Sequence, residues 1–343
     1  MGGLPVFGRK KVAVGLDVGT HSIKSVLLTV SGSTISVTGA GCKEIPTPEA
    51  RAETLKQFVY DEGLKGLDVV TGVAGRSVIV RYVNIHKMAT SELKNAIRFE
   101  ADKYIPFSID EVVLDCQPIE GSENVGPDEM KVLLVAVKRN LIEDHVNLLR
   151  SAGVNPVIVD VDGFALGNAH VLAAGANVDT GVRALVDIGA SKTNINVMEN
   201  NRSLFTREVY VGGADFSDVI ARRLSINPFE VEKLKANPAD KEAEVREAIQ
   251  SVSDDLANEV RLSLDFFENE FDRQVASVLM SGGGARLSGL SESLSTAFKR
   301  PVEVWDPSGA FELKFTRGGE EVFREKSAQM AVAIGLAARM GRN

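Results

Sequence analysis

Two segments of the sequence share one design: Leu16-Asp17-Val18-Gly19-Thr20-His21-Ser22-Ile23-Lys24 and Val186-Asp187-Ile188-Gly189-Ala190-Ser191-Lys192-Thr193-Asn194. In each, an apolar strand ends at an aspartate, a glycine stands two residues later, and a polar loop leads into a returning strand. A tight glycine hairpin can turn its backbone N–H groups toward a phosphate, and a strand-terminal aspartate can hold Mg²⁺ through water. Ordinary hairpin chemistry would explain one copy, but two copies indicate a phosphate-binding function.

A third glycine-rich segment, Met280-Ser281-Gly282-Gly283-Gly284-Ala285-Arg286-Leu287, follows a strand predicted at 278–280. Glycines at this place let a bulky ligand approach the backbone closely, and a following helix N-terminus favours negative charge. The segment is not a Rossmann G-x-G-x-x-G motif, because no βαβ unit precedes it. The sequence also contains no G-x-x-x-x-G-K-[ST] P-loop.

Hydrophobic patterns predict the other elements of an α/β protein. The expected strands lie at 12–19, 23–30, 33–43, 69–73, 78–83, 112–119, 131–137, 156–161 and 184–197, the last a strand–turn–strand. The expected helices lie at 50–62, 91–101, 141–152, 163–174, 241–273 and 327–339. The β-α-β-β-α section at 78–155, with a polar loop at 120–129, is predicted to be a compact inserted subdomain.

The composition is that of a folded protein of 343 residues, long enough for two or three domains with sizeable cores. Apolar residues make up 44% and charged residues 25%, which excludes a disordered or fibrous chain. The net charge of −8 argues against a nucleic-acid partner. Cys42 and Cys116 lie far apart and the four histidines show no paired spacing, so neither a disulfide framework nor a zinc site is expected.

The N-terminal residues 1–11 place basic side chains after a short apolar stretch, which is the reverse of a signal peptide. No run of about 18 apolar residues occurs, so direct membrane insertion is not expected. These features predict a cytoplasmic, reducing compartment and leave peripheral attachment to a membrane through a partner open.

The sequence resembles the actin-like ATPase superfamily, which includes actin, the heat-shock chaperones, sugar kinases and FtsA. Five motifs match in order: phosphate 1 at 16–24, connect 1 at 159–169, phosphate 2 at 185–197, adenosine at 280–290 and connect 2 at 327–339. Within the superfamily the chain is most similar to the PilM family of type IV pilus assembly proteins. Two patterns carry that similarity: Glu92-Leu93-x-x-Ala96-Ile97-x-x-Glu100-Ala101-x-x-Tyr104-Ile105-Pro106-Phe107, and Val159-Asp160-Val161 with Phe164-Ala165-Leu166.

The resemblance implies an α/β, ribonuclease H-like two-domain ATPase fold that binds ATP or ADP with Mg²⁺. It implies domain 1A at 1–77, an inserted SHS2-like domain 1C at 78–155, a return to domain 1A at 156–180, domain 2 at 181–326 and the connect 2 helix at 327–343. In FtsA-like proteins domain 1C takes the place of domain 1B of actin.

The resemblance also implies roles for individual residues. The phosphates are expected between Gly19, Thr20, His21 and Ser22 on one side and Gly189, Ala190, Ser191, Lys192 and Thr193 on the other. Lys24 either reaches phosphate or is a solvated strand residue, and Asp17 and Asp187 are expected to organise hydrated Mg²⁺. Around the nucleoside the expected residues are Gly282, Gly283, Gly284 and Arg286, the Gly212-Gly213 turn, and Glu259 with Ser263, four residues apart on one helix face. The guanidinium of Arg286 is expected to stack on adenine.

Connect 1 offers two catalytic candidates, Asp160 and Asp162, of which Asp162 stands closer to the family position. A polar residue there orients the attacking water in this superfamily. Aspartate has a shorter reach than the Gln or Glu common in relatives. The resemblance therefore predicts slow or no hydrolysis, with ATP acting mainly as a conformational ligand.

PilM-like proteins bind the short N-terminal cytoplasmic segment of the inner-membrane protein PilN between domains 1A and 1C. The residues expected to bind such a peptide are Leu93, Ala96, Ile97, Tyr104, Ile105, Pro106 and Phe107, although Leu93 and Ile97 also fit the core of the insert itself. The resemblance further implies contact with the pilus assembly motor ATPases and the platform protein, self-association, and a cytoplasmic place at the inner membrane.

Two other functions stay open at this point. FtsA-like proteins of cell division carry an amphipathic membrane helix beyond connect 2, and a chain that stops at Asn343 is expected to lack the length for one. Sugar kinases place larger inserts and a catalytic acid around their sugar, whereas the insert in this sequence fits the 1C pattern.

Overall fold

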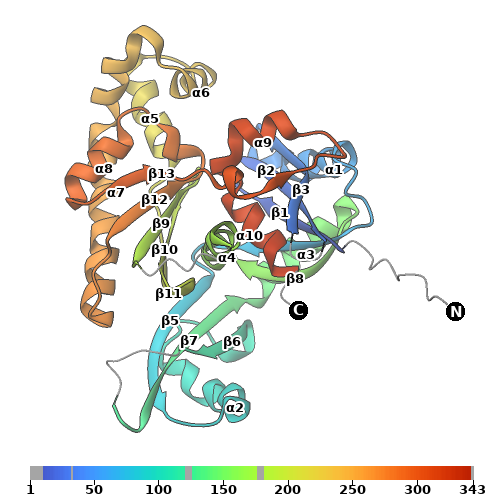
Figure 1. Ribbon diagram of the computed structural model, residues 1–343, viewed down its shortest axis with the longest axis vertical. Helices are drawn as coiled ribbons and strands as arrows, with labels where there is room; N and C mark the ends of the chain where they lie inside the picture. The colour runs from blue at the N-terminus through green and yellow to red at the C-terminus, as the bar shows by residue number, and fades with distance from the viewer. Residues whose placement is uncertain (1–10, 32–33, 120–125, 176–180, 341–343) are drawn as a thin grey trace, which may run out of the picture.

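The computed structural model describes residues 11–31, 34–119, 126–175 and 181–340. The predictions for the N-terminal segment 1–10, for most of the 120–129 loop and for the last three residues therefore lie outside the described residues. Figure 1 shows two lobes side by side, each built on a sheet, with a smaller sheet below them.

The first domain is built on a six-stranded sheet. Across the sheet the strands are β14 (Glu312–Leu313), β3 (Thr34–Glu44), β2 (Ser22–Ser31), β1 (Lys11–Val18), β4 (Asp68–Val73) and β8 (Asn155–Val161). The predicted hairpin is confirmed, because β1 and β2 pair antiparallel with Asp17 opposite Lys24. The carboxyl ends of β1, β4 and β8 meet at one edge, because these three strands are parallel.

The second domain repeats this beginning. Its strands run in the order β11 (Arg202–Val209), β10 (Thr193–Glu199), β9 (Arg183–Ile188), β12 (Ser277–Ser281) and β13 (Val302–Val304). Its helices are α5 (Gly213–Leu224), α6 (Pro228–Ala236), α7 (Glu242–Phe271) and α8 (Leu290–Phe298). The apolar stripe predicted on the long helix is confirmed, since α7 buries Val245, Ile249, Val252, Leu256, Val260, Leu264, Phe267 and Phe271. In the described part of the chain, no helix is both long and apolar enough to cross a bilayer.

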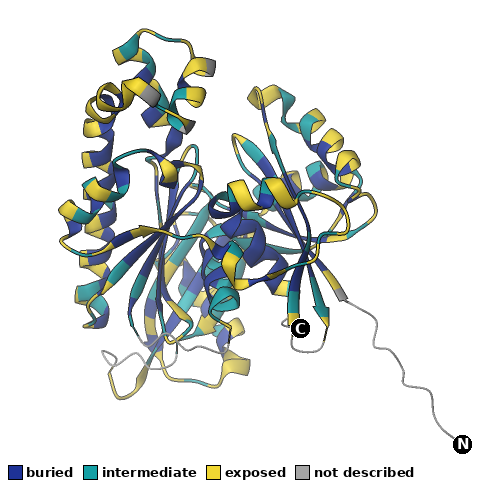
Figure 2. Cartoon of the chain, turned by 45° about the horizontal axis from the view of Figure 1, so that its top comes forward, coloured by how far each residue is buried: buried dark blue, intermediate teal, exposed yellow. Residues whose placement is uncertain are grey.

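Two helices join the domains: α4 (Asp162–Ala174) and α10 (Ala331–Arg339). Their backbones come closest at Gly335, where a Cβ would lie 1.7 Å from the carbonyl oxygen of Ala165. On its other side α10 lies against β1, where a Cβ on Gly15 would lie 2.0 Å from the carbonyl oxygen of Ala333. In Figure 2 this crossing is part of the buried interior.

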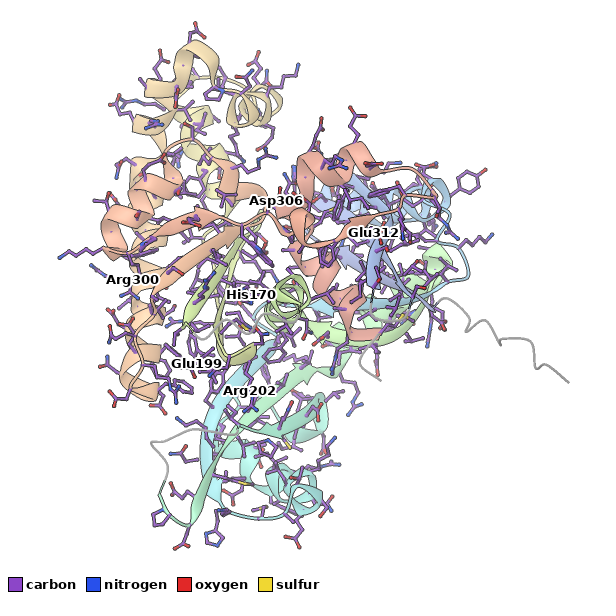
Figure 3. The ribbon with its side chains drawn as sticks, viewed as in Figure 1. His170, Glu199, Arg202, Arg300, Asp306 and Glu312 are labelled. Carbon is purple, nitrogen blue, oxygen red and sulfur yellow. The ribbon has the colours of Figure 1, made fainter. Side chains whose placement is uncertain are left out.

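The chain returns to the first domain earlier than the predicted boundary at 327. β14 pairs with β3, and Phe311 packs with Val26 and Val37 in the first-domain core. The helix α9 (Glu320–Lys326) adds Phe323 to the same core. Figure 3 places Asp306 where the chain crosses between the lobes and Glu312 over the first sheet. A two-residue strand carries no periodic signal, so the sequence pattern did not reveal this return.

The insert consists of β5 (Val78–His86), α2 (Thr90–Glu100), β6 (Val112–Pro118) and β7 (Glu129–Lys138), with its sheet in the order β5-β7-β6. It has a core of its own, which includes Leu93, Ile97, Ile105, Val112 and Leu134. The entry and exit of the insert are adjacent, because the Lys138 N–H donates to the Ser77 carbonyl at 3.0 Å.

The helix α3 (Arg139–Ala152) was predicted as part of the insert, but the structure packs it elsewhere. Its Leu149 is buried in the first-domain core with Leu55 and Phe58 of α1 (Arg51–Asp61). The insert as a packed unit therefore ends at β7, not at residue 155. The apolar spacing of a helix shows which face is buried but not which domain covers that face.

Candidate functional site

A cavity of about 350 Å³ lies between the two predicted phosphate hairpins. It is lined by Asp17, Gly19, Thr20, His21, Ser22 and Lys24 of the first hairpin and by Asp187, Gly189, Ala190, Ser191 and Lys192 of the second. The sequence prediction that these two segments face one site is therefore matched by the geometry. Thr193 stands just outside, buried at the start of β10, where its hydroxyl donates to the carbonyl of Val211.

The two hairpins have the same turn. The Gly19 N–H donates to the Ser22 carbonyl at 3.0 Å, and the Gly189 N–H donates to the Lys192 carbonyl at 2.9 Å. A Cβ on Gly19 would lie 2.9 Å from the Ser22 carbonyl oxygen, so the turn requires glycine there. The loop tips approach each other across the cavity, with the hydroxyl oxygens of Thr20 and Ser191 3.3 Å apart.

An ion pair joins the two strands of the first hairpin beside the turn. Lys24 Nζ lies 2.8 Å from an Asp17 carboxylate oxygen, and each side chain is 14% exposed. Burial alone would lower the pKa of Lys24, but the neighbouring Asp17 carboxylate outweighs that effect and the pKa is raised. Lys24 is thus a charged residue of the cavity, which resolves the alternative of a solvated strand lysine.

The second hairpin carries a buried carboxylate. Asp187 is 7% exposed, and it accepts a hydrogen bond from the Ser281 hydroxyl at 2.9 Å. Burial raises the pKa of Asp187. Ser281 ends β12, directly before the glycine run, so one hydrogen bond joins the second hairpin to the third glycine segment.

Of the two catalytic candidates, the structure brings only Asp162 to the cavity. Lys192 donates to its carboxylate at 3.3 Å and lies 3.0 Å from Glu208 of β11. Burial raises the pKa of Asp162 to about 6 despite Lys192. Asp160 is placed differently: its carboxylate accepts from the Val161 N–H and lies 3.4 Å from Arg339 of α10. Asp160 still lies in β8, whereas Asp162 is the first residue of α4, where the chain has left the sheet.

In the glycine run, two of the three glycines serve packing. A Cβ on Gly282, whose φ is +87°, would lie 2.4 Å from the Ile188 carbonyl oxygen, and one on Gly284 would lie 2.4 Å from the Ile188 side chain. Gly283 is exposed, and the nearest atom to a Cβ there would be Gln329 at 3.9 Å. Gly283 is therefore the glycine of this run with room for a ligand, but neither these three glycines nor Arg286 lines the cavity between the hairpins. The guanidinium of Arg286 is exposed and donates to the Glu325 carbonyl. The helix α8 begins only at Leu290, so the glycines lead into a 3₁₀ turn rather than directly into a helix.

The Gly212-Gly213 turn stacks on the second hairpin. The Gly213 N–H donates to the Gly189 carbonyl at 2.8 Å, and a Cβ on Gly212 would lie 2.7 Å from the Ala190 carbonyl oxygen. Lys235 of α6 reaches the same turn and donates to the Gly213 carbonyl at 3.2 Å. Lys235 carries no signal in the sequence, because α6 contains no superfamily motif.

Glu259 and Ser263 are not brought to the cavity. Ser263 is completely buried, and its hydroxyl donates to the Glu259 carbonyl within α7. Ser263 follows Val260 by three residues and precedes Phe267 by four, which puts it on the stripe that faces the second-domain core. The i, i+4 spacing does place the two residues on one side of α7, but at Ser263 this side is covered by the second-domain core and is not open to a ligand.

Residues outside the motifs also line the cavity, among them Arg51, Asp144 and His145. Arg51 donates to the Val18 carbonyl at 2.7 Å. His145 Nε2 lies 2.8 Å from the Thr71 hydroxyl, and burial lowers the pKa of His145 to about 4, so it is neutral at pH 7. No motif signals these residues in the sequence, because α3 and α1 reach the cavity only through tertiary packing.

The donor set fits a nucleotide with Mg²⁺. Carboxylates of Asp17, Asp162 and Asp187 border one cavity together with hairpin amides and two lysines. Within the described ranges, no three His, Cys, Asp or Glu side chains come close enough to hold a metal ion by themselves. The carboxylates of Asp17, Asp162 and Asp187 suit Mg²⁺, which keeps several waters and takes further oxygens from phosphates.

The residues predicted to bind a peptide divide into two groups. Leu93, Ile97 and Ile105 are buried in the core of the insert, at 0%, 2% and 6% exposure, so they are not surface residues. Pro106 is exposed, Ala96 is half-buried, and Tyr104 and Phe107 pack partly against the core. Lys138 Nζ lies 4.5 Å from the centre of the Phe107 ring. A helical stripe of large apolar residues is a core signal first, which explains the correction.

A model of the family described as type IV pilus assembly protein PilM matches residues 15–341. The chain belongs to the PilM family. A solved PilM–PilN type IV pilus biogenesis complex is similar in structure, with 29% sequence identity, a TM-score of 0.82 and coverage of 96% of this chain and 98% of that one. Membership in the PilM family makes the chain an actin-like protein of type IV pilus assembly.

Two more distant proteins share the fold with this PilM-family chain. MreB 5 of Spiroplasma citri, solved with AMPPNP, superposes with a TM-score of 0.51 at 12% identity, covering 96% of this chain and 95% of MreB. The cell division protein FtsA of Bacillus subtilis (strain 168) is 23% identical over 254 residues, which are 65% of this chain and 57% of FtsA. The chain thus spans little more than half the length of that relative. The predicted actin-like two-domain fold is confirmed.

Proposed function

We propose that this chain binds ATP or ADP, with Mg²⁺, in the cavity between its two domains. The observation that carries the proposal is the pair of equivalent turns at Gly19 and Gly189, which face each other across a cavity with a volume of about 350 Å³. Their backbone amides are donors for phosphate oxygens, and Lys24 and Lys192 add positive charge. The shared fold with an AMPPNP-bound MreB supports the choice of ligand.

When bound, Mg²⁺ supplies charge neutralisation for the phosphates. The carboxylates of Asp17, Asp162 and Asp187 would hold its water ligands. We infer slow or no hydrolysis, because Asp162 is short and is engaged with Lys192. Nucleotide then acts mainly by bringing the two hairpins, and hence the two domains, together.

The partner that we propose is a membrane protein of the PilN type, bound through its N-terminal cytoplasmic peptide. Its support is the 29% identical PilM–PilN complex, which covers 96% of this chain. Pro106 is exposed and Phe107 is half-buried on the insert, so both side chains are accessible to such a peptide. In this proposal the chain is cytoplasmic, is held at the inner membrane by its partner, self-associates, and links that partner to the motor ATPases and platform protein.

The test is titration calorimetry of the full chain with Mg·ATP and with N-terminal peptides of candidate membrane partners. Phe107→Ala should weaken peptide binding about tenfold and leave ATP affinity unchanged. Phe99→Ala is the matched control, because Phe99 lies on the same insert but is 83% exposed on α2. If Phe99→Ala weakens the peptide and Phe107→Ala does not, the peptide lies on the other face of the insert. If wild-type protein binds no Mg·ATP, the proposed nucleotide function is wrong.

A further inference from the structure

The insert, which belongs to the first domain by sequence, makes an aromatic contact with the second domain. Tyr82 of β5 stacks on Phe205 of β11, with ring centres 5.6 Å apart and an angle of 30° between the rings. It meets Phe271 of α7 edge to face at 6.0 Å. The phenol oxygen accepts a hydrogen bond from the Thr206 N–H at 2.6 Å. Two aromatic rings and one backbone N–H group of the second domain therefore hold Tyr82 in place.

A charged pair lies beside these rings. Lys131 of β7 is 1% exposed, and its Nζ lies 2.8 Å from a carboxylate oxygen of Glu270 on α7. The same ammonium lies 4.5 Å from the centre of the Phe271 ring. A buried ammonium is tolerated because the Glu270 carboxylate and the Phe271 ring both stabilise its charge. Both partners come from the second domain.

The contact continues toward the nucleotide cavity. Where the chain leaves the first domain, the Gly75 N–H donates to Glu208 of β11 at 3.1 Å, and the Arg76 guanidinium lies 4.7 Å from the centre of the Tyr210 ring. Glu208 also pairs with Lys192 at the cavity. Figure 1 shows β5 beside β11, the edge strand of the second sheet, and Figure 3 places Glu199 and Arg202 at the end of that sheet nearest the insert.

Opening of the cavity requires the two hairpins to separate by movement about the crossing helices α4 and α10. We propose that five residues, Tyr82, Lys131, Phe205, Glu270 and Phe271, form a clamp between insert and second domain that resists this opening. The clamp couples a peptide bound on the insert to the nucleotide, because a shift of the insert changes the contact that holds the domains closed. This inference rests on the proposed nucleotide function for its effect on ligand release and on the proposed peptide partner for the coupling.

The test uses charge reversal within the clamp. Glu270→Lys places two ammonium groups together, and Glu270 is 40% exposed, so the new lysine can reach water without disturbing the fold. Asp265→Lys makes the same charge change on an exposed position of the same helix and is the matched control. The double variant Lys131→Glu with Glu270→Lys restores an opposite pair.

The first readout is hydrogen exchange of the nucleotide-free full chain. Glu270→Lys should speed exchange in Val78–His86 and Arg202–Val209 about fivefold or more, while Asp265→Lys matches wild type and the double variant recovers protection. The second readout is release of a fluorescent ADP analogue, which Glu270→Lys should speed by about 3- to 10-fold. Tyr82→Phe, which removes only the acceptor of the Thr206 N–H, replaces Glu270→Lys if that variant does not fold.

Unchanged exchange in both segments in Glu270→Lys, or no recovery in the double variant, overturns the clamp. Faster exchange with unchanged ADP release shows that the contact exists but does not hold the cavity closed, which also overturns the proposal. Absence of ADP binding in wild-type protein instead contradicts the proposed nucleotide function, and the exchange measurement then decides the clamp independently.

Discussion

Asp187 combines burial, a raised pKa and a hydrogen bond from Ser281 at the point where two glycine segments meet. Its charge is costly in the nucleotide-free protein, because no described lysine or arginine lies within ion-pair distance of it. A hydrated cation would relieve that cost. The residue therefore has more to gain from Mg²⁺ than Asp17, which already pairs with Lys24.

Asp187→Asn should accordingly weaken binding of Mg·ATP about tenfold or more, while metal-free ADP binds as well as before. Asparagine keeps an oxygen to accept from Ser281, so the loop stays in place. Calorimetry with each ligand measures the difference. Equal losses for both ligands would mean that Asp187 positions the hairpin and has no role in cation binding.

His145 gives the site a dependence on pH. Burial lowers its pKa to about 4 from an ordinary 6.5, so the unfolded chain binds more protons between these values and stability is lost as pH falls through that window. At pH 4.5 the loss is about 2 kcal/mol relative to pH 7, using about 1.4 kcal/mol per pKa unit. Asp162, with its pKa raised to about 6, acts in the opposite direction, since its protonation favours the folded state.

His145→Gln keeps a partner for Thr71 and removes the titration. Urea unfolding at pH 7 and pH 4.5 should show that the variant loses about 2 kcal/mol less than wild type on acidification. Asp162 is present in both proteins, so its contribution cancels in the comparison. The same acid loss in both proteins would exclude His145 as the source.

At the scale of the element, the glycines at 282–284 serve two different purposes: two of them allow close packing, and one leaves room for a ligand. Gly282 and Gly284 have no room for a side chain against Ile188, whereas Gly283 is exposed and open. Gly283→Val should therefore fold normally and reduce ATP affinity about tenfold by blocking the approach of the nucleoside. Gly309→Val is a control at another exposed, open glycine, and it should change neither folding nor affinity.

Circular dichroism and ATP titration on Gly283→Val and Gly309→Val, with Gly284→Val for comparison, distinguish a glycine needed for packing from a glycine needed for ligand binding. Gly284→Val should lower the melting temperature, because its Cβ would meet the Ile188 side chain at 2.4 Å. If Gly283→Val also melts early, the whole run is structural and the nucleoside contact assigned to Gly283 is wrong.

The two phosphate hairpins and the long helix were predictable because each carries its whole signal locally, in a strand, a glycine and a strand, or in an apolar stripe. The alternative that Leu93 and Ile97 belong to the core of the insert could also be predicted, because their apolar spacing on one helix is a local signal. What the sequence could not show depends on contacts between distant segments. The return of β14 to β3, the packing of α3 on α1 and the burial of Ser263 each depend on which face of one element meets which other element.

At the scale of the whole molecule, the insert is joined to the first domain through two adjacent strand ends, because Ser77 and Lys138 are hydrogen-bonded neighbours and the insert has its own core. Replacement of residues 78–137 by a short glycine linker should therefore leave a folded two-domain protein, since α3 stays with the first domain. Mg·ATP should still bind, with faster release, and the partner peptide should not. Calorimetry with both ligands checks this, and a variant that fails to fold would show that the second domain needs the insert for stability.

The close crossing of α10 with β1 and α4 has a consequence for synthesis on the ribosome. β1 begins at Lys11, but the helix that covers it begins at Ala331, so the first sheet emerges long before its cover exists. The nascent chain must hold the apolar face formed by Ala13, Val26 and Leu28 without its final packing partner, while the second domain folds first. We expect that nucleotide capture, as proposed above, waits for α10, because this helix packs on both β1 and α4 and is synthesised after both hairpins. We expect the unfinished chain to depend on chaperones more than its modest size suggests.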